Sequence, residues 1–231
     1  MKIAICLSGA PRFAHRGLFK QLDAMRGFDQ ADMFIRTWKT KEFGETAEEF
    51  EKYLRNNGLP DNCNFCVTQI LDDIPENNSK PIDLLFRVWA PYFAHFWYGI
   101  VQTNNLRKKY QEKTNANYDA VVRMRTDIVP TGTFDFRDYA EDVKTHMINA
   151  DNFGDTFLFG APDMYDRFVG YYDHLQVLSK RRTVIHPEES LRAYFHECGI
   201  PYKKLPILFQ PVRDNNEYQT RQQLTPTHAE Y

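Results

Sequence analysis

Apolar and polar positions follow one another along the chain in blocks that predict an α/β fold. Residues 2–7 are almost wholly apolar, which is typical of a strand buried on both faces of a parallel sheet. A small-residue turn at 8–12 follows, and apolar residues at helical spacing then predict a helix over 14–26. A second apolar run at 31–38 completes a strand–helix–strand unit, which indicates a parallel sheet.

The rest of the chain continues this alternation. We expect further helices over 45–57, 91–112, 162–180 and 187–198, and further strands over 63–71, 118–125, 144–150, 155–160 and 202–209. No internal repeat and no Ser/Gly linker interrupts the pattern. Residues 1–209 are therefore expected to form one α/β domain, and residues 210–231 a polar C-terminal tail.

Charge and composition narrow the classes of function. The 231 residues carry 29 Lys+Arg and 31 Asp+Glu, and the net charge of −2 gives no global reason to bind nucleic acid or an anionic membrane. A hydrophobic fraction of 42% is enough to build a core. The apolar opening is too short for a signal peptide, and the stretch 84–101 is broken by Arg and Pro, so we expect no membrane span.

The four cysteines are too few for a disulfide framework. Cys63 and Cys66 have the spacing of a metal knuckle or a redox pair, but no second pair follows at a suitable distance. The segment also continues as a strand, whereas a redox pair normally opens a helix. We expect ordinary thiols in a cytoplasmic protein.

The first candidate site is the turn after the first strand, because ligands bind beyond the carboxyl ends of strands in parallel sheets. Ser8 and Gly9 allow backbone N–H groups to approach a ligand, and Arg12 adds a planar cation suited to phosphate. The turn matches neither the dinucleotide-binding glycine fingerprint nor a Walker loop. A plain turn with a solvated arginine is the alternative.

The second candidate is the end of the strand at 118–125. Alternation places Arg123, Arg125 and Asp127 on one side of the chain. Two guanidinium groups and a carboxylate suit a diphosphate with a divalent cation, in which the carboxylate holds Mg²⁺ or Mn²⁺ and the arginines offset phosphate charge. An internal Arg–Asp salt-bridge cluster is the alternative.

Two further segments carry groups that can act as bases. In the polar loop before the strand at 155–160, Asp151 or Asp155 is a candidate base or acceptor of a substrate hydroxyl, although Asp also favours turns and caps. His186 and Glu188 are candidates as well, although the Pro and acids there also suit an ordinary helix start.

These motifs, in their order, resemble a group of small glycosyltransferase-like proteins from bacterial polysaccharide clusters, large viruses and phages. The resemblance is carried by residues 3–13, 32–38, 118–127, 155–160 and 186–189. The group is similar to the GT-A nucleotide-diphospho-sugar transferases. It implies a Rossmann-like GT-A fold with a mixed, mostly parallel sheet flanked by helices, an activated-sugar donor and, often, Mn²⁺ or Mg²⁺.

One position departs from the family pattern. GT-A enzymes end a strand with Asp-x-Asp, whereas this chain has Arg125-Thr126-Asp127. The resemblance leaves Asp127 as the metal ligand, and Arg125 in the first acidic place can take over part of the cation's role on the diphosphate.

The residues and the resemblance together predict transfer of a sugar from a nucleotide-diphosphate sugar to a hydroxyl of a glycan or another acceptor. The leaving diphosphate needs stabilisation, which we assign to Arg12, Arg123, Arg125 and a metal ion held by Asp127. An inverting mechanism also needs a base, for which Asp155, Glu188 and His186 are candidates; a retaining one does not. A nucleotidyltransferase and a non-catalytic nucleotide- or glycan-binding module are the alternatives.

Nucleic acid enters only as a possible acceptor carrying a modified base. The basic runs 107–109 and 180–182 are the features that favour it. Such runs are usually solvated helix ends.

Overall fold

The structure is a computed structural model that describes residues 1–9, 17–41, 43–72, 90–149, 157–180 and 187–211. Its main sheet has seven strands in the described residues: β1 Lys2–Ser8, β3 Gln30–Trp38, β4 Cys63–Leu71, β5 Ala120–Met124, β8 Met147–Asn149, β9 Leu158–Gly160 and β10 Tyr202–Lys204. Their spatial order is β10-β8-β9-β5-β1-β3-β4. All neighbours are parallel except β9, which is antiparallel to both β5 and β8. The predicted α/β class with a mixed, mostly parallel sheet is confirmed.

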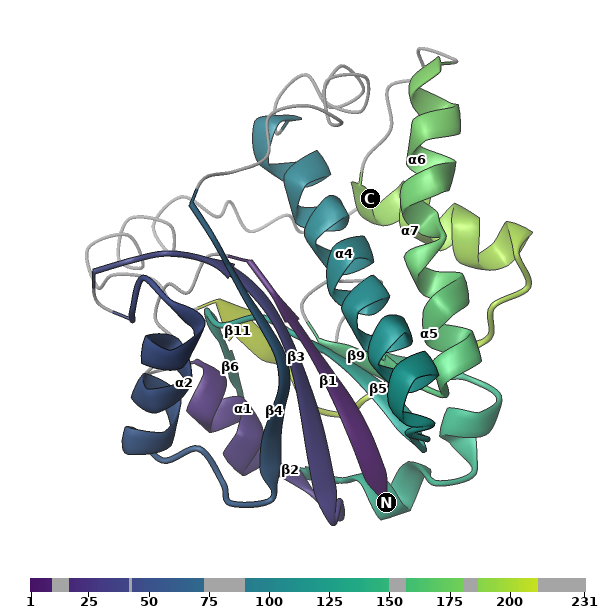
Figure 1. Cartoon of the computed structure of the whole chain (residues 1–231). Coiled ribbons are helices and arrows are strands. Elements are labelled where there is room, and N and C mark those ends of the chain that lie inside the picture. The colour runs from purple at the N-terminus through teal and green to yellow at the C-terminus, as the bar shows by residue number, and fades with distance from the viewer. Residues whose placement is uncertain (10–16, 42, 73–89, 150–156, 181–186, 212–231) are drawn as a thin grey trace, which may run out of the picture.

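Helices cover both faces of this sheet (Figure 1). They are α1 Leu18–Ala24 and α2 Ala47–Asn56 on one face, and α4 Ala90–Thr114, α5 Pro162–Val169, α6 Tyr171–Lys180 and α7 Pro187–Glu197 on the other. Strand alternation explains the two layers, because Ile3 and Ile5 of β1 enter one core and Ala4 and Cys6 enter the other. Within the described chain, no helix combines the length and apolar character needed to cross a membrane.

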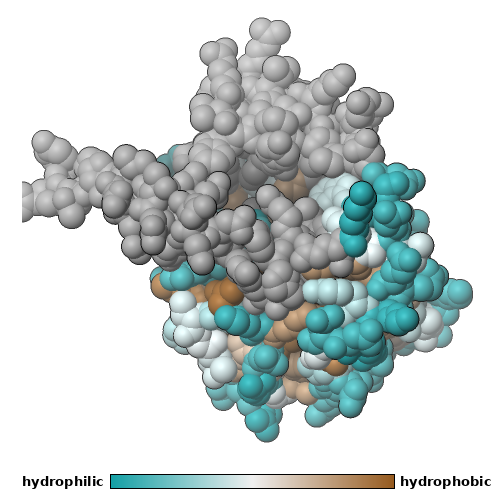
Figure 2. Space-filling model, turned by 90° about the vertical axis from the view of Figure 1, so that its left-hand side faces the viewer, coloured by the Kyte–Doolittle hydropathy of each residue, from teal (hydrophilic) through white to brown (hydrophobic). Residues whose placement is uncertain are grey.

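Helix α2 shows how local sequence sets an element. The Thr46 hydroxyl accepts a hydrogen bond from the backbone N–H of Glu49 at 3.2 Å, and the Glu49 carboxylate accepts one from the Thr46 N–H at 3.3 Å. Phe50 and Leu54 are buried against the sheet. The opposite side of the helix is polar. Figure 2 views the molecule from the left-hand side of Figure 1, where α2 lies, and hydrophilic residues cover much of the coloured part of that surface.

The single helix predicted over 162–180 is wrong, because the structure divides it at Gly170 into α5 and α6. The hydroxyl of Tyr194, from α7, donates to the carbonyl of Arg167 at 2.7 Å. A Cβ at position 170 would lie 2.6 Å from that hydroxyl. The tyrosine hydroxyl therefore uses the carbonyl that the N–H of residue 171 would use in a continuous helix, and a side chain at position 170 would collide with it.

The structure also corrects the predicted bounds of one helix and one strand. The helix predicted over 14–26 stops at Ala24, and Met25–Arg26 forms the short strand β2, paired with β7 Phe134–Asp135. The strand predicted over 202–209 is two strands, β10 and β11 Phe209–Pro211, and β11 pairs with β6 Ile128–Pro130. Elements of two or three residues leave no periodic signal, so the sequence did not predict β2, β6 and β7.

Candidate functional site

The carboxyl ends of β1 and β5 lie side by side where the strand order reverses. The chain passes from β1 through α1 to β3 on one side, and α4 then leads to β5 on the other side of β1. Ligands bind at such a switch point in open α/β sheets. The register aligns Leu7 with Met124, so the predicted turn and the segment at 123–127 meet at this edge.

The turn after β1 is fixed by its neighbour β3. Gly9 has a φ of +122°, a conformation that residues with a Cβ rarely adopt. Its N–H donates to the carbonyl of Arg36 at 3.3 Å, and its carbonyl accepts from the Thr37 hydroxyl at 2.8 Å. Ser8 is buried as the last strand residue. Arg12 lies outside the described residues, so its role stays a prediction.

Arg123 and Arg125 share one aromatic ring. Their guanidinium carbons lie 5.2 and 5.6 Å from the centre of Phe96 in α4. Arg123 is fully buried and donates to the Ser8 carbonyl at 3.4 Å, whereas the Arg125 side chain is 25% exposed. Arg123 can therefore act on a ligand through its charge, and Arg125 can contact one directly.

Asp127 forms a two-fold hydrogen-bonded ion pair with Arg125. The Arg125 Nε lies 3.0 Å from one carboxylate oxygen and Nη2 lies 3.0 Å from the other. The sequence left a salt bridge and a ligand site as alternatives for these residues. The structure shows that the salt bridge forms, and a guanidinium held in this way is also positioned for an anion.

Helix α1 holds the turn that carries this pair. The side-chain amide of Gln21 donates to the carbonyls of Arg125 and Ile128 at 2.5 and 3.0 Å. At Gly17, a Cβ would come within 2.1 Å of the Thr126 carbonyl oxygen. The glycine allows α1 to pack directly on the turn, which fixes the backbone on both sides of Asp127.

The described residues at this edge do not fit a divalent-cation site. Mg²⁺ and Mn²⁺ bind through several oxygen ligands, and carboxylates are foremost among them. Asp127 already engages Arg125 with both of its oxygens. In the part of the chain that the structure describes, no three His, Cys, Asp or Glu side chains gather into a possible metal site. The assignment of Asp127 as a metal ligand stays a prediction.

Arg36 is a site residue that the sequence analysis did not single out. It lies near the end of β3, aligned with Ser8, and is 7% exposed. Its guanidinium carbon lies 5.4 Å from the ring centre of Tyr98, and its Nε donates to Gln69 at 3.2 Å. Burial lowers the pKa of Arg36. An arginine that follows the apolar run 33–35, close to the carboxyl end of the strand, is the signal that would have found it.

The three predicted bases cannot be placed. Asp155 and His186 lie outside the described residues, as does the side chain of Glu188. Strand β9 follows Asp155 and its first residue, Leu158, pairs with Arg123. Their roles stay predictions.

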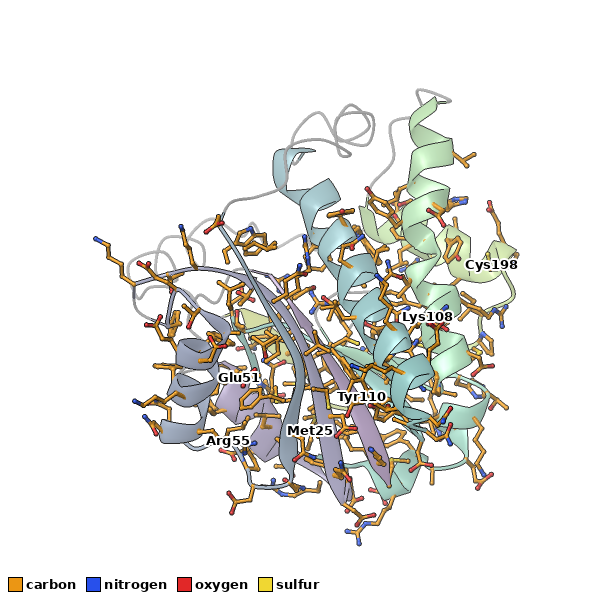
Figure 3. All side chains as sticks on the ribbon, viewed as in Figure 1. Met25, Glu51, Arg55, Lys108, Tyr110 and Cys198 are labelled. Carbon is orange, nitrogen blue, oxygen red and sulfur yellow. The ribbon has the colours of Figure 1, made fainter. Side chains whose placement is uncertain are left out.

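The basic run 107–109 is not a solvated helix end throughout. Arg107 is buried and forms an ion pair with Asp166 of α5, which Lys108 also approaches at 3.4 Å. Lys108 lies on the side of α4 nearest α5 in Figure 3. Two of these three cations therefore join helices, which weakens the case for a nucleic-acid acceptor.

Cys63 and Cys66 lie on strand β4, as the sequence predicts, and not at the start of a helix, where a redox pair normally lies. Both thiols are free, and burial raises the pKa of Cys63 and of Cys66 to about 11. The thiolate that a metal or a redox reaction requires is therefore disfavoured.

No model of a known protein family matches the sequence, and no curated protein matches it. The resemblance to GT-A transferases therefore stays a prediction, and the site is interpreted from its own geometry.

Proposed function

We propose that the protein is a glycosyltransferase that uses a nucleotide-diphosphate sugar as donor and a hydroxyl of a glycan, or of another acceptor, as acceptor. The observation that carries this proposal is the gathering of Arg123, Arg125 and the Ser8–Gly9 turn at the switch point of the sheet. Guanidinium groups at such an edge suit the diphosphate of a sugar nucleotide. The proposed GT-A assignment rests on the same placement.

In this reaction the bond between the anomeric carbon and the diphosphate oxygen breaks, and the electron pair stays on the diphosphate. The acceptor oxygen forms the new bond and loses its proton. Arg125 would offset the charge that develops on the leaving group, with Asp127 holding its guanidinium plane in place and the charge of Arg123 behind it. Asp155, Glu188 and His186 remain the candidate proton acceptors for an inverting course.

Nucleotidyl transfer is less well supported. That chemistry usually recruits two metal ions through several carboxylates. Among the described residues of this edge, Asp127 is the carboxylate at hand, and it is paired with Arg125.

A thermal-shift screen with UDP-, GDP- and CDP-sugars, each with and without Mn²⁺, tests the proposal. We expect one donor class to raise the melting temperature and to be hydrolysed slowly to the nucleoside diphosphate. Binding without turnover, even when hydroxyl acceptors are added, would indicate a non-catalytic module. Binding of nucleoside triphosphates alone, with release of pyrophosphate, would indicate a nucleotidyltransferase.

A further inference from the structure

Guanidinium groups lie on both sides of the turn that follows β1. Strands β3 and β5 flank β1, and the register aligns Arg36 with Ser8 and Arg123 with Cys6. Neighbouring strands lie about 4.8 Å apart, so the strands that carry the two arginines, β3 and β5, are separated by roughly 10 Å. Arg123 reaches the Ser8 carbonyl, which brings its charge to the end of β1.

Two aromatic side chains of α4 hold these arginines by their faces. Phe96 contacts Arg123 and Arg125, and Tyr98 contacts Arg36. A guanidinium packed in this way keeps a fixed plane, and its N–H edge can still meet oxygen ligands. The Arg125 side chain is 25% exposed, whereas Arg36 is buried with 7% of its surface still exposed.

The buried charge of Arg36 has no ion-pair partner among the described residues. Asp127, a described carboxylate at this edge, pairs with Arg125. Burying an arginine is costly without an anion or a strong hydrogen-bond acceptor. A bound diphosphate would supply negative charge beside Arg36.

We propose that this edge binds a diphosphate through Arg36 and Arg125, with Arg123 behind them, and that these arginines take the place of a divalent cation. Arg36 is thereby a donor-binding residue. The identification of the ligand as a nucleoside diphosphate rests on the proposed function, whereas the arginine site itself rests on the geometry above.

Isothermal titration of the full chain with UDP, GDP, CDP, ADP and inorganic pyrophosphate, in EDTA and in Mn²⁺, tests the proposal without any substitution. We expect at least one nucleoside diphosphate to bind in EDTA with a Kd within about two-fold of its value in Mn²⁺. A Kd that is ten-fold or more weaker in EDTA would show that a cation carries the diphosphate, and would overturn the inference while leaving the transferase proposal intact.

Substitution of Arg36 tests its own role. We expect Arg36→Gln to weaken the same ligand about ten-fold in EDTA, and Arg36→Lys to restore part of the loss because it keeps the charge. Gln69→Leu serves as the matched control, since it removes the hydrogen-bond acceptor of Arg36 and leaves the guanidinium charge. An unchanged Kd in Arg36→Gln, with the variant folded by circular dichroism, contradicts the assignment.

Two outcomes separate this inference from the proposed function. If pyrophosphate binds in EDTA but none of the nucleotides does, the arginine site stands and the sugar-nucleotide donor fails. If neither pyrophosphate nor any nucleotide binds in either buffer, both proposals fail.

Discussion

The two ends of β3 carry buried charges on the same face of the sheet, and the two groups are built differently. At the amino end, Asp32 accepts hydrogen bonds from Lys2, Tyr118 and Gln30, each at 2.9 Å, and from Asn64 at 3.3 Å. Side chains from four different positions therefore donate to one carboxylate. Tyr110, labelled on α4 in Figure 3, lies over this end of the sheet.

At the carboxyl end three arginines gather. Arg36, Arg123 and Arg125 are packed on aromatic rings, and Asp127 pairs with Arg125. The Asp32 cluster pairs its charge within the fold, which fits a structural role, whereas we propose that the arginines of the carboxyl end bind a ligand. The comparison therefore separates stability from binding within one strand, and substitutions at the two ends should have opposite consequences.

The largest expected effect is on the packing that holds the carboxyl end. In Gly17→Ala, the new Cβ would meet the Thr126 carbonyl oxygen at 2.1 Å and backbone atoms of Ile128 at 2.9 Å. Because these are backbone atoms, the turn must move, and we expect the free energy of unfolding to fall by about 3 kcal/mol in urea denaturation.

Gly99→Ala is the matched control. Its Cβ would lie 3.5 Å from the Ser8 side chain, which is an ordinary van der Waals contact. Inside a helix, alanine is also more favourable than glycine by about 1 kcal/mol. We expect equal or higher stability in this variant. Equal stability of the two variants would show that α1 does not hold the turn.

The next effect concerns the amino end. Burial raises the pKa of Asp32, but hydrogen bonds from Lys2, Tyr118, Gln30 and Asn64 outweigh it and hold the pKa below the usual value. Asp32→Asn should therefore cost about 2 kcal/mol at neutral pH, since a charged acceptor is replaced by a neutral group that also brings a donor. Binding of nucleoside diphosphates should be unchanged.

The same variant gives a pH signature. A carboxyl group whose folded pKa is lowered contributes stability that is present above its unfolded pKa and is lost as the pH falls through the folded pKa. The difference between wild type and Asp32→Asn should thus shrink as the pH falls below about 4. Asp29→Asn, which removes an exposed partner of the N-terminus, should have a smaller effect. A constant difference down to pH 2 would contradict the charged role of Asp32.

The sequence predicts those parts of this contrast that depend on residues close together in the chain, and it does not predict contacts between distant positions. The apolar runs predict β1, β3, β4 and β5, and alternation at a strand end predicts that Arg125 and Asp127 share a side. The bond between Tyr118 and Asp32 joins positions 86 residues apart. No periodic pattern carries such a pairing, because it exists only once β5 and β3 flank β1.

The same reason explains what was missed at the carboxyl end. Arg36 is recognisable as a site residue only from its positions beside Tyr98 and Ser8, which belong to two other elements. Gln21 contacts the turn at 125–128 across more than 100 residues of sequence. Sequence reasoning found the residues whose neighbours along the chain carry the signal, and it could not find those whose partners are set by topology.

The smallest expected effect is the most direct test of the comparison. Arg125→Gln removes a guanidinium that is 25% exposed and paired with Asp127. If the pair is only a salt bridge, little should change, because partly exposed ion pairs contribute at most about 1 kcal/mol to stability. If it positions a ligand-binding cation, the Kd of a nucleoside diphosphate should rise about ten-fold, which corresponds to about 1.4 kcal/mol.

Arg137→Gln separates these cases, since Arg137 pairs with Asp135 two residues away, as Arg125 does with Asp127, but its side chain is 75% exposed and its pair lies outside the carboxyl edge. Removing Arg137 should leave the Kd unchanged by calorimetric titration. Equal Kd values for the two variants and the wild type would reduce the pair of Arg125 and Asp127 to the same structural role. A loss confined to Arg125→Gln, with its melting temperature close to that of wild type, would show that the Arg125 guanidinium is used for binding.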